Sequence, residues 1–355
     1  MIARPAARRV GMAAPIVEVV VEPNQPESSI AKLIRYAKET KIPWIIEDLW
    51  QDGGIALIHS LEGEFKSVLS YQIAETVATG SPLLRAWDVP CARRVGILET
   101  EMDDLEVGKR LGSMYPDAHW PATLEVSDSA LLKEFRRRTT FPERLACIDH
   151  WLTERKVEVL IWDTINSMLA TGEPNSERSV SQFFDGIALL PAKSTLIVRH
   201  DVKPSRDAAL RSSNQLVRGS NRLVEDASVV IHLKRLDKAS NKVQMEVGKL
   251  RNGPKPEPIE LWFDAGTFRL TPLPPIVALL EYGSLSRQEL IAQAESRFSL
   301  KERAVDEHRA QLTGCLDETK DGHQRILSLN HQFRPDADSE VAKWWKLVRK
   351  PAAPA

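Results

Sequence analysis

Short apolar segments recur five times between residues 50 and 235, and each ends in polar or charged residues. They lie at 55–58, 94–98, 157–162, 194–198 and 229–233, and segments with helical features separate them, including a mostly helical stretch at 103–156. A hairpin of strands at 243–247 and 259–263 is expected to follow. Strands that alternate with helices form a mostly parallel sheet with helices on its faces. Such a sheet binds its ligand along the edge where the strands' carboxyl ends meet. The sequence therefore predicts an α/β fold with its ligand along one edge.

The composition agrees with this class. The chain has 355 residues, of which 43% are hydrophobic and 27% charged, as in an ordinary globular protein of about two domains. The net charge is −1, so no overall positive field attracts nucleic acid, and any such contact must come from local basic patches. Composition alone neither requires nor excludes DNA binding.

The three cysteines, Cys91, Cys147 and Cys315, are far apart and show no C-x-x-C spacing. This pattern fits neither a disulfide framework nor a zinc cluster, and favours reduced thiols in a cytoplasmic protein. Residues 1–15 lack the apolar core of a signal peptide, and no apolar run is long enough to span a bilayer. We therefore expect a cytoplasmic location and no membrane partner.

The first candidate site is the segment 53–67, which reads as a strand, a loop and the start of a helix. The helix opens with Lys66 and Ser67, where backbone N–H groups attract a phosphate, the lysine reaches the outer phosphates and the serine hydroxyl takes a magnesium ion. The expected nucleotide-binding residues are Ser60, Gly63, Glu64, Phe65, Lys66, Ser67 and Val68. The alternative is an ordinary strand-to-helix turn with a chance Lys-Ser pair.

The loop departs from the phosphate-loop pattern G-x-x-x-x-G-K-[ST]. Ser60 and Phe65 occupy the two glycine positions, and Gly63 is the glycine inside the loop. Glu62 and Glu64 add negative charge that would oppose a triphosphate unless both side chains point outward.

A strand at 157–162 ends in Asp163. A carboxylate at this place, paired with the serine of a phosphate loop, orders the Mg²⁺ ion of a nucleotide site. The pairing with Ser67 predicts a nucleotide site with Mg²⁺ as its metal.

Two further side chains follow strands at the same edge. Glu101, after the strand at 94–98, is suited to polarise an attacking water, although Glu101, Asp103 and Asp104 would equally suit the first turn of the next helix. His200, after the strand at 194–198, is suited to sense a γ-phosphate or simply to form a hydrogen bond at a strand end.

Five stretches, 63–67, 97–102, 161–163, 198–200 and 249–254, occur in the order found in RecA-type ATPases. They resemble the Walker A loop, the strand bearing the catalytic glutamate, Walker B, the sensor strand and the K-x-R-N-G-P turn, here Lys249-Leu250-Arg251-Asn252-Gly253-Pro254. The span 43–270 therefore resembles the AAA_25-like core of the RepA and DnaB group of hexameric replicative helicases.

This resemblance implies a homo-oligomer, with a hexameric ring as the expected form, in which Arg251 acts as an arginine finger on the neighbouring subunit's nucleotide and Lys249 assists. It also implies that ATP is the bound nucleotide, with Mg²⁺, that Glu101 activates water and that His200 senses the γ-phosphate. The polar segments 171–181 and 203–217 would line the ring and contact single-stranded DNA. The residues expected to do so are Arg178, Lys203, Arg206, Arg211 and Arg218.

We expect four segments: a leader at 1–42, the RecA-like ATPase domain at 43–271, a smaller domain at 276–332 and a tail at 333–355. In the smaller domain, Ser286 and Glu289 have the Ser-x-x-Glu spacing of a capping box at the start of its second helix. Three helices followed by a hairpin resemble a winged helix, whose third helix would present Lys301, Arg303, His308 and Arg309 to DNA. A winged helix used for protein contacts and a plain helical appendage are the alternatives.

The sequence thus supports a ring-forming ATPase with helicase-like action on single-stranded DNA, in replication or mobile-element maintenance. A second hypothesis is a DNA-binding regulator gated by nucleotide, with little or no hydrolysis. A third, an accessory ATPase that loads a partner, would use the same residues.

Overall fold

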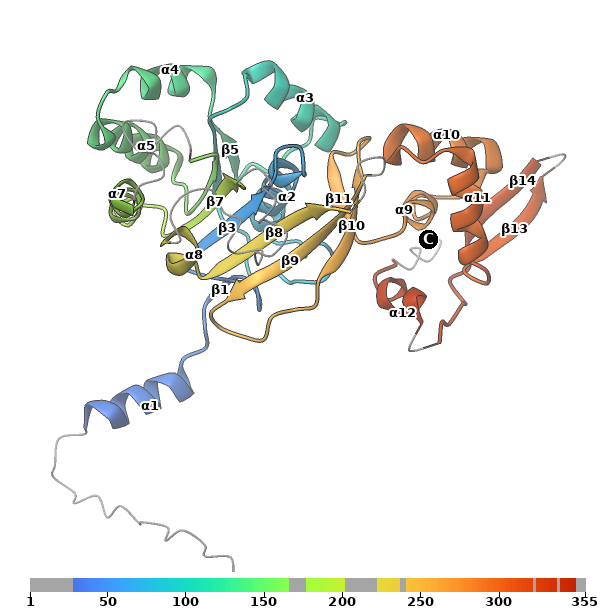
Figure 1. The fold of residues 1–355 in the computed structure, drawn as a ribbon, viewed down its shortest axis with the longest axis horizontal. Helices are drawn as coiled ribbons and strands as arrows, with labels where there is room; N and C mark the ends of the chain where they lie inside the picture. Colours follow the sequence, from blue (N-terminus) through green and yellow to red (C-terminus); the bar gives the residue numbers. More distant parts are fainter. Residues whose placement is uncertain are drawn as a thin grey trace, which may run out of the picture. The chain divides into compact units, whose positions relative to one another are not determined.

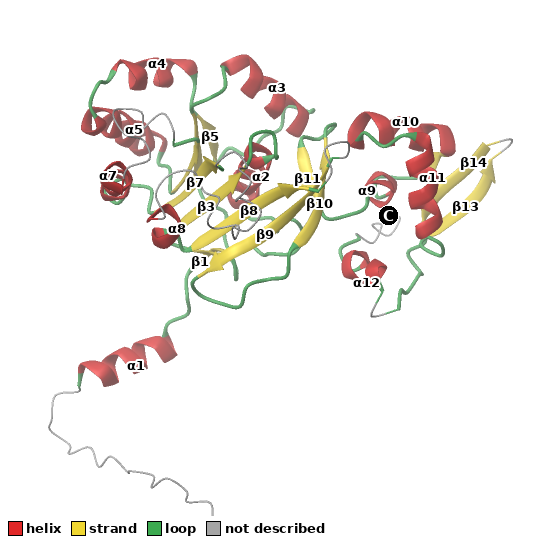
Figure 2. Ribbon diagram, viewed as in Figure 1, coloured by secondary structure: helices red, strands yellow, loops and turns green. Residues whose placement is uncertain are grey.

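The structure, a computed structural model, describes residues 28–165, 177–201, 222–236, 241–321, 324–336 and 339–348. The chain divides into two compact units, residues 1–42 and 43–355. The described part of the first unit is helix α1 (Ser29–Glu39), which Ser28 caps and which buries none of its side chains (Figures 1 and 2). All other described elements belong to the second unit.

A nine-stranded sheet forms the centre of the second unit, in the order β11-β10-β9-β8-β3-β7-β6-β4-β5 (Figure 1). The six strands from β8 to β5 are parallel, and β9, β10 and β11 are antiparallel. The strands are β3 (Ile55–Ser60), β4 (Val95–Glu99), β5 (Leu124–Val126), β6 (Val159–Asp163), β7 (Ser194–His200), β8 (Val229–Arg235), β9 (Lys242–Leu250), β10 (Ile259–Asp264) and β11 (Arg269–Thr271). A two-stranded sheet of β1 (Trp44–Ile46) and β2 (Trp50–Gln51) precedes them. The predicted α/β fold is confirmed.

Helices cover both faces of the sheet (Figure 2). Successive strand residues point to opposite faces, so Ala56 and Ile58 pack with α2 while Leu57 packs with the helices of the other face. On the first face lie α2 (Lys66–Thr79) and α3 (Asp104–Met114), and on the second lie α4 (Ser129–Arg137), α5 (Phe141–Arg155), α7 (Glu177–Ile187) and α8 (Arg222–Asp226). None of the described helices is both long and apolar enough to cross a membrane.

One strand departs from expectation. Residues 103–156 read as mostly helical, but β5 lies among them and pairs in parallel with β4 at the edge of the sheet. Its three residues are half-buried and too short to show a strand period, so the pattern could not reveal it. The hairpin expected at 243–247 and 259–263 is confirmed by the antiparallel pairing of β9 with β10.

A smaller body of helices and a three-stranded antiparallel sheet follows β11, with the strand order β12-β14-β13. Its elements are α9 (Pro275–Leu280), β12 (Leu285–Ser286), α10 (Arg287–Phe298), α11 (Glu302–Gln311), β13 (Leu316–Asp321), β14 (Gln324–Leu329) and α12 (Glu340–Trp345). Ser286 and Glu289 form the predicted capping box of α10. Arg297 of α10 pairs with Asp264 of β10, which ties this body to the large sheet.

Candidate nucleotide-binding site

The phosphate loop leaves β3 at Ser60 and enters α2 at Lys66. Gly63 and Phe65 both have left-handed backbone, with φ of 77° and 65°. A glycine takes this conformation without steric cost, whereas Phe65 must be held in it by its surroundings. Its ring stacks on Phe263 with centroids 4.5 Å apart, and the Arg235 guanidinium lies 5.4 Å from the ring centroid. Packing therefore stabilises the residue that replaces the second glycine of the motif.

Lys66 is 5% exposed and turns back over the loop. Its Nζ donates hydrogen bonds to the Leu61 carbonyl at 2.7 Å and to both the carbonyl and the hydroxyl of Ser60 at 3.2 Å. Burial lowers the pKa of Lys66, and the negative charges of Asp163 and Asp201 oppose that shift. Ser60, which replaces the first glycine of the motif, thus supplies a hydroxyl that holds the lysine.

The two acidic loop residues differ. Glu62 is exposed, while Glu64 is half-buried. Burial raises the pKa of Glu64, and hydrogen bonds from the backbone of Arg235 and Leu61 partly offset the rise. Val68, expected at the nucleotide, places its side chain in the hydrophobic core, so only its backbone is left for a phosphate contact.

Asp163 ends β6 with 2% exposure and accepts hydrogen bonds from the Ser67 hydroxyl and, at 3.0 Å, from Ser70 Oγ. Beside it on β4, in register, lies Glu99, which is 1% exposed and was not predicted as a site residue. Burial and the negative charge of Asp163 raise the pKa of Glu99 to about 7. Two buried carboxylates and a hydroxyl are oxygen ligands of the kind that Mg²⁺ takes, so these residues fit the expected ion.

Glu101 and His200 meet at the same edge. His200 Nε2 lies 3.4 Å from Glu101 Oε1, and Thr164 Oγ1 donates to that oxygen at 2.8 Å. Asp103, rather than Glu101, caps the next helix by accepting from the Glu106 N–H at 2.8 Å. The capping explanation therefore applies to Asp103 and leaves Glu101 facing the site.

Lys249 and Arg251 lie near the amino ends of the parallel strands, away from the carboxyl ends that carry the phosphate loop. Lys249 pairs with Val230 at the start of β8, and the Arg251 N–H donates to the Ser228 carbonyl at 2.9 Å. The phosphate loop follows the other end of the neighbouring strand β3, which at ~3.3 Å per residue is roughly 17 Å long. Within one chain, neither side chain is placed to act on its own phosphate loop.

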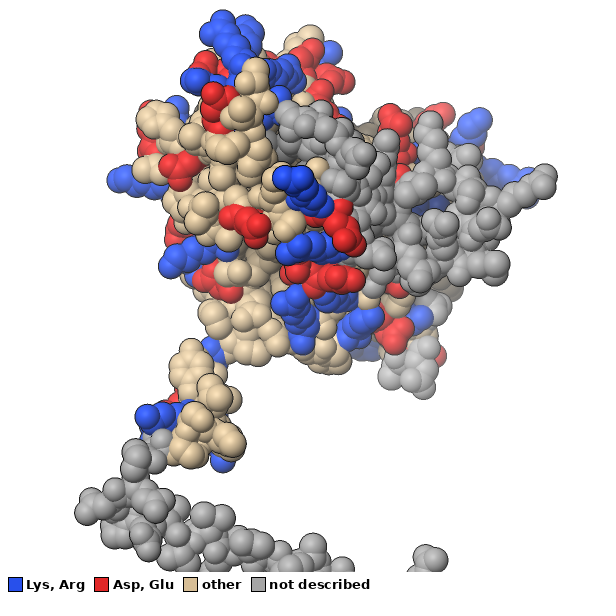
Figure 3. Space-filling model, turned by 60° about the vertical axis from the view of Figure 1, so that its left-hand side comes forward, with Lys and Arg blue, Asp and Glu red and all other residues tan. Residues whose placement is uncertain are grey.

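The residues expected to contact DNA are only partly described. Arg178 is exposed on α7, while Lys203, Arg206, Arg211 and Arg218 lie outside the described residues. On the face shown in Figure 3, basic and acidic side chains of the described part are interspersed, without one continuous basic surface.

The third helix of the smaller body, α11, carries mixed charge. Lys301 precedes it and is exposed, Arg303 pairs with Glu307 at 2.8 Å, and Arg309 is half-buried. His308, expected to face DNA, instead packs against Trp262 with ring centroids 5.6 Å apart, because α11 lies against β10 there.

Sequence comparison matches residues 25–205, just over half of the chain, to the AAA_25 model, described as an AAA domain. No curated protein sequence matches. Among solved structures, one that consists of an ATPase domain superposes with a TM-score of 0.50 at 14% identity, covering 70% of this chain and 100% of that one. That likeness shows the fold.

Two other solved structures superpose less well. A KaiC-like protein from the archaeon Pyrococcus horikoshii OT3 gives a TM-score of 0.45 at 14% identity, covering 65% of this chain and 94% of its own. The RadB recombinase gives 0.42 at 13% identity, covering 63% and 92%. The family match, together with the phosphate loop on a mostly parallel sheet, establishes that this chain belongs to the AAA_25 family of AAA domains and has a RecA-like P-loop ATPase fold.

Proposed function

We propose that this protein is an ATPase that assembles into a ring and uses ATP hydrolysis to move on single-stranded DNA. The carboxyl edge of the sheet carries Lys66 and Ser67 of α2, Asp163 and His200 at the ends of β6 and β7, and Glu101 just after β4. A phosphate-binding lysine, a pair of Mg²⁺ ligands and a carboxylate for water are the parts that phosphoryl transfer needs.

Each residue has a role in this proposal. Lys66 would release its loop carbonyls and bind the outer phosphates, while Ser67 and Asp163 would hold Mg²⁺ with Glu99 beside them. A bound Mg²⁺ ion would neutralise phosphate charge. Glu101 would orient the attacking water and accept its proton, and Thr164, through its hydroxyl, would fix the Glu101 carboxylate.

The position of Arg251 is the observation that most supports assembly into a ring. Its Nη2 donates to the Glu225 carbonyl at 2.7 Å, at the sheet edge away from the phosphate loop. An arginine there can neutralise a transferring phosphoryl group only in another subunit. Lys249, which donates to the Val224 and Glu225 carbonyls, would accompany it. A hexameric ring is the assembly we propose.

Movement on DNA rests on the polar segments 171–181 and 203–217, and on Arg178, Lys203, Arg206, Arg211 and Arg218. We propose that the smaller body is a winged helix, and that Lys301, Arg303 and Arg309 add backbone contacts to DNA. Because the net charge is only −1, binding should be weak and strongly dependent on salt.

A mixing experiment tests the shared site. Glu101→Gln and Arg251→Ala should each abolish most ATP turnover when alone, because every site lacks one part. Mixed in equal amounts, they should regain activity, since some sites then combine an intact Glu101 with a neighbour's intact Arg251. Arg155→Ala is the control and should turn over ATP like the wild type. Arg155 lies on the surface, where its Nη1 is 3.8 Å from Glu125 Oε2.

Absence of recovery on mixing, or a mass by light scattering that stays monomeric with ATP and Mg²⁺, would contradict the ring. The half-buried Glu64 inside the phosphate loop favours one other function, a nucleotide-gated DNA-binding regulator. That function holds instead if the wild type, Lys66→Ala and Arg251→Ala are equally inert while the wild type still binds ATP.

A further inference from the structure

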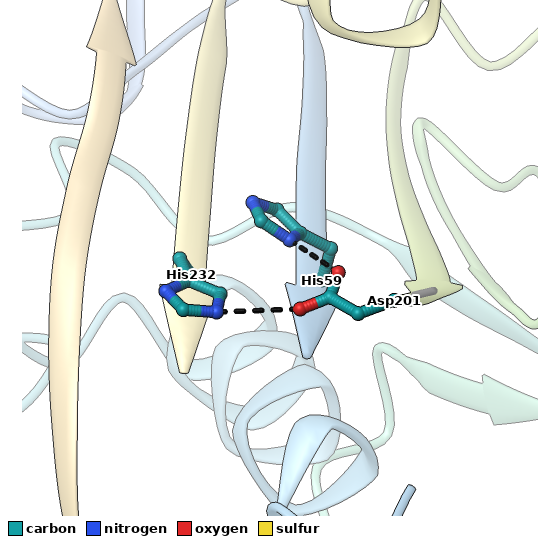
Figure 4. Close-up of side chains that lie close together, drawn as sticks. All are labelled: His59, Asp201 and His232. Atoms are coloured by element: carbon teal, nitrogen blue, oxygen red, sulfur yellow. Dashed lines mark hydrogen bonds and ion pairs between the residues drawn. The ribbon is translucent and has the colours of Figure 1, made fainter. Parts of the chain in front are cut away.

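Three buried polar side chains join the carboxyl ends of neighbouring strands beneath the phosphate loop (Figure 4). His59 of β3 and His232 of β8 are register partners, and their rings stack with centroids 4.7 Å apart and an angle of 24°. Asp201 directly follows β7, and its carboxylate lies between the two rings' nitrogens. Their exposed fractions are 0% for His59, 6% for Asp201 and 7% for His232.

The carboxylate of Asp201 contacts both imidazoles. Its Oδ1 lies 2.7 Å from His59 Nδ1, and its Oδ2 lies 3.3 Å from His232 Nε2. The first is a short hydrogen bond, and the second is a longer polar contact that is not a well-aligned hydrogen bond. A buried carboxylate is costly unless such partners compensate it, so both histidines are needed to keep Asp201 ionised.

The protonation of His59 follows from these contacts. Nδ1 must carry the proton that it donates to Asp201, and Nε2 is buried with no partner among the described residues. A second proton on Nε2 would have no acceptor, so His59 is held as the neutral Nδ1–H tautomer. The three residues thus form a defined buried unit, held by the His59–Asp201 hydrogen bond and the contact of Asp201 with His232, which we call the His-Asp-His cluster.

Two histidines and an aspartate are also the kinds of side chain that bind transition metals. The distance between His59 and Asp201, however, fits a shared hydrogen bond better than two ligands of one metal ion. Two ligands of one tetrahedral zinc ion, each ~2.0–2.1 Å from it, lie about 3.3 Å apart. The contact between Asp201 and His232 has that length, whereas His59 and Asp201, at 2.7 Å, are closer than two ligands of one ion.

Two members of the cluster, His59 and Asp201, adjoin residues of the nucleotide site. His59 precedes Ser60, whose carbonyl accepts from Lys66 Nζ and also from the Asp201 N–H at 2.8 Å. Asp201 itself follows His200, which contacts Glu101. The position of Asp201 therefore determines where both His200 and the start of the phosphate loop lie.

We infer that Asp201 is a positioning residue, which uses His59 and His232 to lock the end of β7 to β3 and β8 so that His200 stays beside Glu101. This inference rests on the proposed ATPase for its role in turnover, but the locking itself does not depend on hydrolysis. Substituting Asp201 should impair the chemical step more than nucleotide binding, because the loop, Lys66 and Ser67 remain in place.

The test compares Asp201→Ala and Asp201→Asn with Asp264→Asn. Asp264 is also a buried aspartate with a charged partner, Arg297, but lies on β10 away from the site. Asp201→Ala should lower kcat by about tenfold or more while changing the KM for ATP less than about threefold. Asp201→Asn should recover part of kcat, since its amide still accepts from His59, and Asp264→Asn should lower only thermal stability.

Hydrogen exchange gives a second measurement that needs no turnover. In Asp201→Ala, amides at 59–66 and 195–201 should exchange faster than in the wild type and in Asp264→Asn. If the wild type hydrolyses no ATP, the proposed function fails, and selective loosening of these segments still supports the lock.

Three results would overturn the inference: unchanged kcat in an active protein carrying Asp201→Ala, unchanged exchange at these segments, or an equal loss of kcat in Asp264→Asn. Elemental analysis that finds one equivalent of zinc in the wild type and none in Asp201→Ala would replace the lock with a metal site.

Discussion

Glu99 and Asp163 lie side by side on β4 and β6, and their mutual burial makes a second negative charge expensive. Glu99 accepts from the N–H groups of Glu101 and Met102 at 3.0 and 3.2 Å, so it also shapes the turn that presents Glu101. Because Glu99 lies beside Asp163, the proposed Mg²⁺ ligand, we expect the protonation of Glu99 to depend on whether Mg²⁺ is bound.

Glu99→Gln should stabilise the protein at pH 8 when no divalent cation is present. Burial, and next the negative charge of Asp163, raise the pKa of Glu99 in the folded protein to about 7. The protonated carboxyl therefore contributes fully to the free energy of unfolding below the pKa of the unfolded chain, and this contribution is lost as the pH rises through 7. The neutral amide avoids that loss, worth about 1–3 kcal/mol. Urea denaturation should show the gain at pH 8 and little difference at pH 5, with exposed Glu62→Gln as an unchanged control. A less stable variant at pH 8 would contradict this account.

The His-Asp-His cluster should make folding sensitive to acid. Burial lowers the pKa of His59, so the unfolded chain takes up its proton first and stability falls as the pH drops below about 6.5. Burial by itself raises the pKa of Asp201, but the contacts of its carboxylate with His232 and His59 outweigh that effect and bring the pKa to about 2. The contribution of ionised Asp201 to the free energy of unfolding is full above about pH 3.9 and is lost as the pH falls toward 2.

Thermal denaturation between pH 8 and pH 5 measures the histidine part of this effect. His59→Gln should flatten the decline, whereas exposed His119→Gln should leave it unchanged. Glu99 acts in the opposite direction over this range, so the comparison is between variant and wild type. The same dependence of melting temperature on pH in His59→Gln and in the wild type would show that His59 does not stay neutral on folding.

At the scale of elements, the contact of β4 with α5 is unusually close. A Cβ added at Gly96 would lie 2.8 Å from the Trp151 ring and 3.0 Å from Val157 Cγ2, both in the packed core. A rigid ring cannot move aside cheaply, so this glycine lets α5 approach the strand that carries Glu99.

Gly96→Ala should therefore cost about 1–3 kcal/mol of unfolding free energy through overpacking. Gly108, exposed within α3 and with no atom within 4 Å of an added Cβ, is the matched control. Gly108→Ala should stabilise by about 0.5–1 kcal/mol, because alanine favours helix. Urea denaturation of the two variants should give changes of opposite sign, and equal changes would refute the packing argument.

At the scale of the whole second unit, partly buried ion pairs link the large sheet to the smaller body. Arg297 Nε donates to Asp264 Oδ1 at 3.0 Å and its Nη2 contacts the other oxygen, while Arg85 of the large body pairs with Glu281 at 2.6 Å. Paired carboxylates of this kind hold two bodies in one arrangement, because separating them would leave a buried charge alone.

Arg297→Ala should destabilise the protein by about 2–4 kcal/mol, since Asp264 stays buried without its partner. Arg303→Ala removes an exposed pair with Glu307 and should cost less than about 0.5 kcal/mol. Calorimetry of both variants checks the difference. Equal melting temperatures would mean that water replaces the Arg297 contact.

The predictable parts of this protein were those encoded locally. The apolar strands, the Lys66-Ser67 helix start and the Ser286 capping box each depend on neighbouring residues, and each was correctly predicted. The roles assigned to Glu101, His200 and Arg251 remain predictions, although the first two do meet in space.

The amino-acid sequence by itself determined the strand and helix alternation, and with it an α/β sheet whose strand ends carry polar groups. Only the tertiary structure decided which of those groups meet: Glu99 beside Asp163, and Asp201 between His59 and His232. The reason is that strand order brings together residues that are distant in the chain, such as His59 and Asp201, which are 142 positions apart. The burial that sets their charge arises only when the sheet is packed.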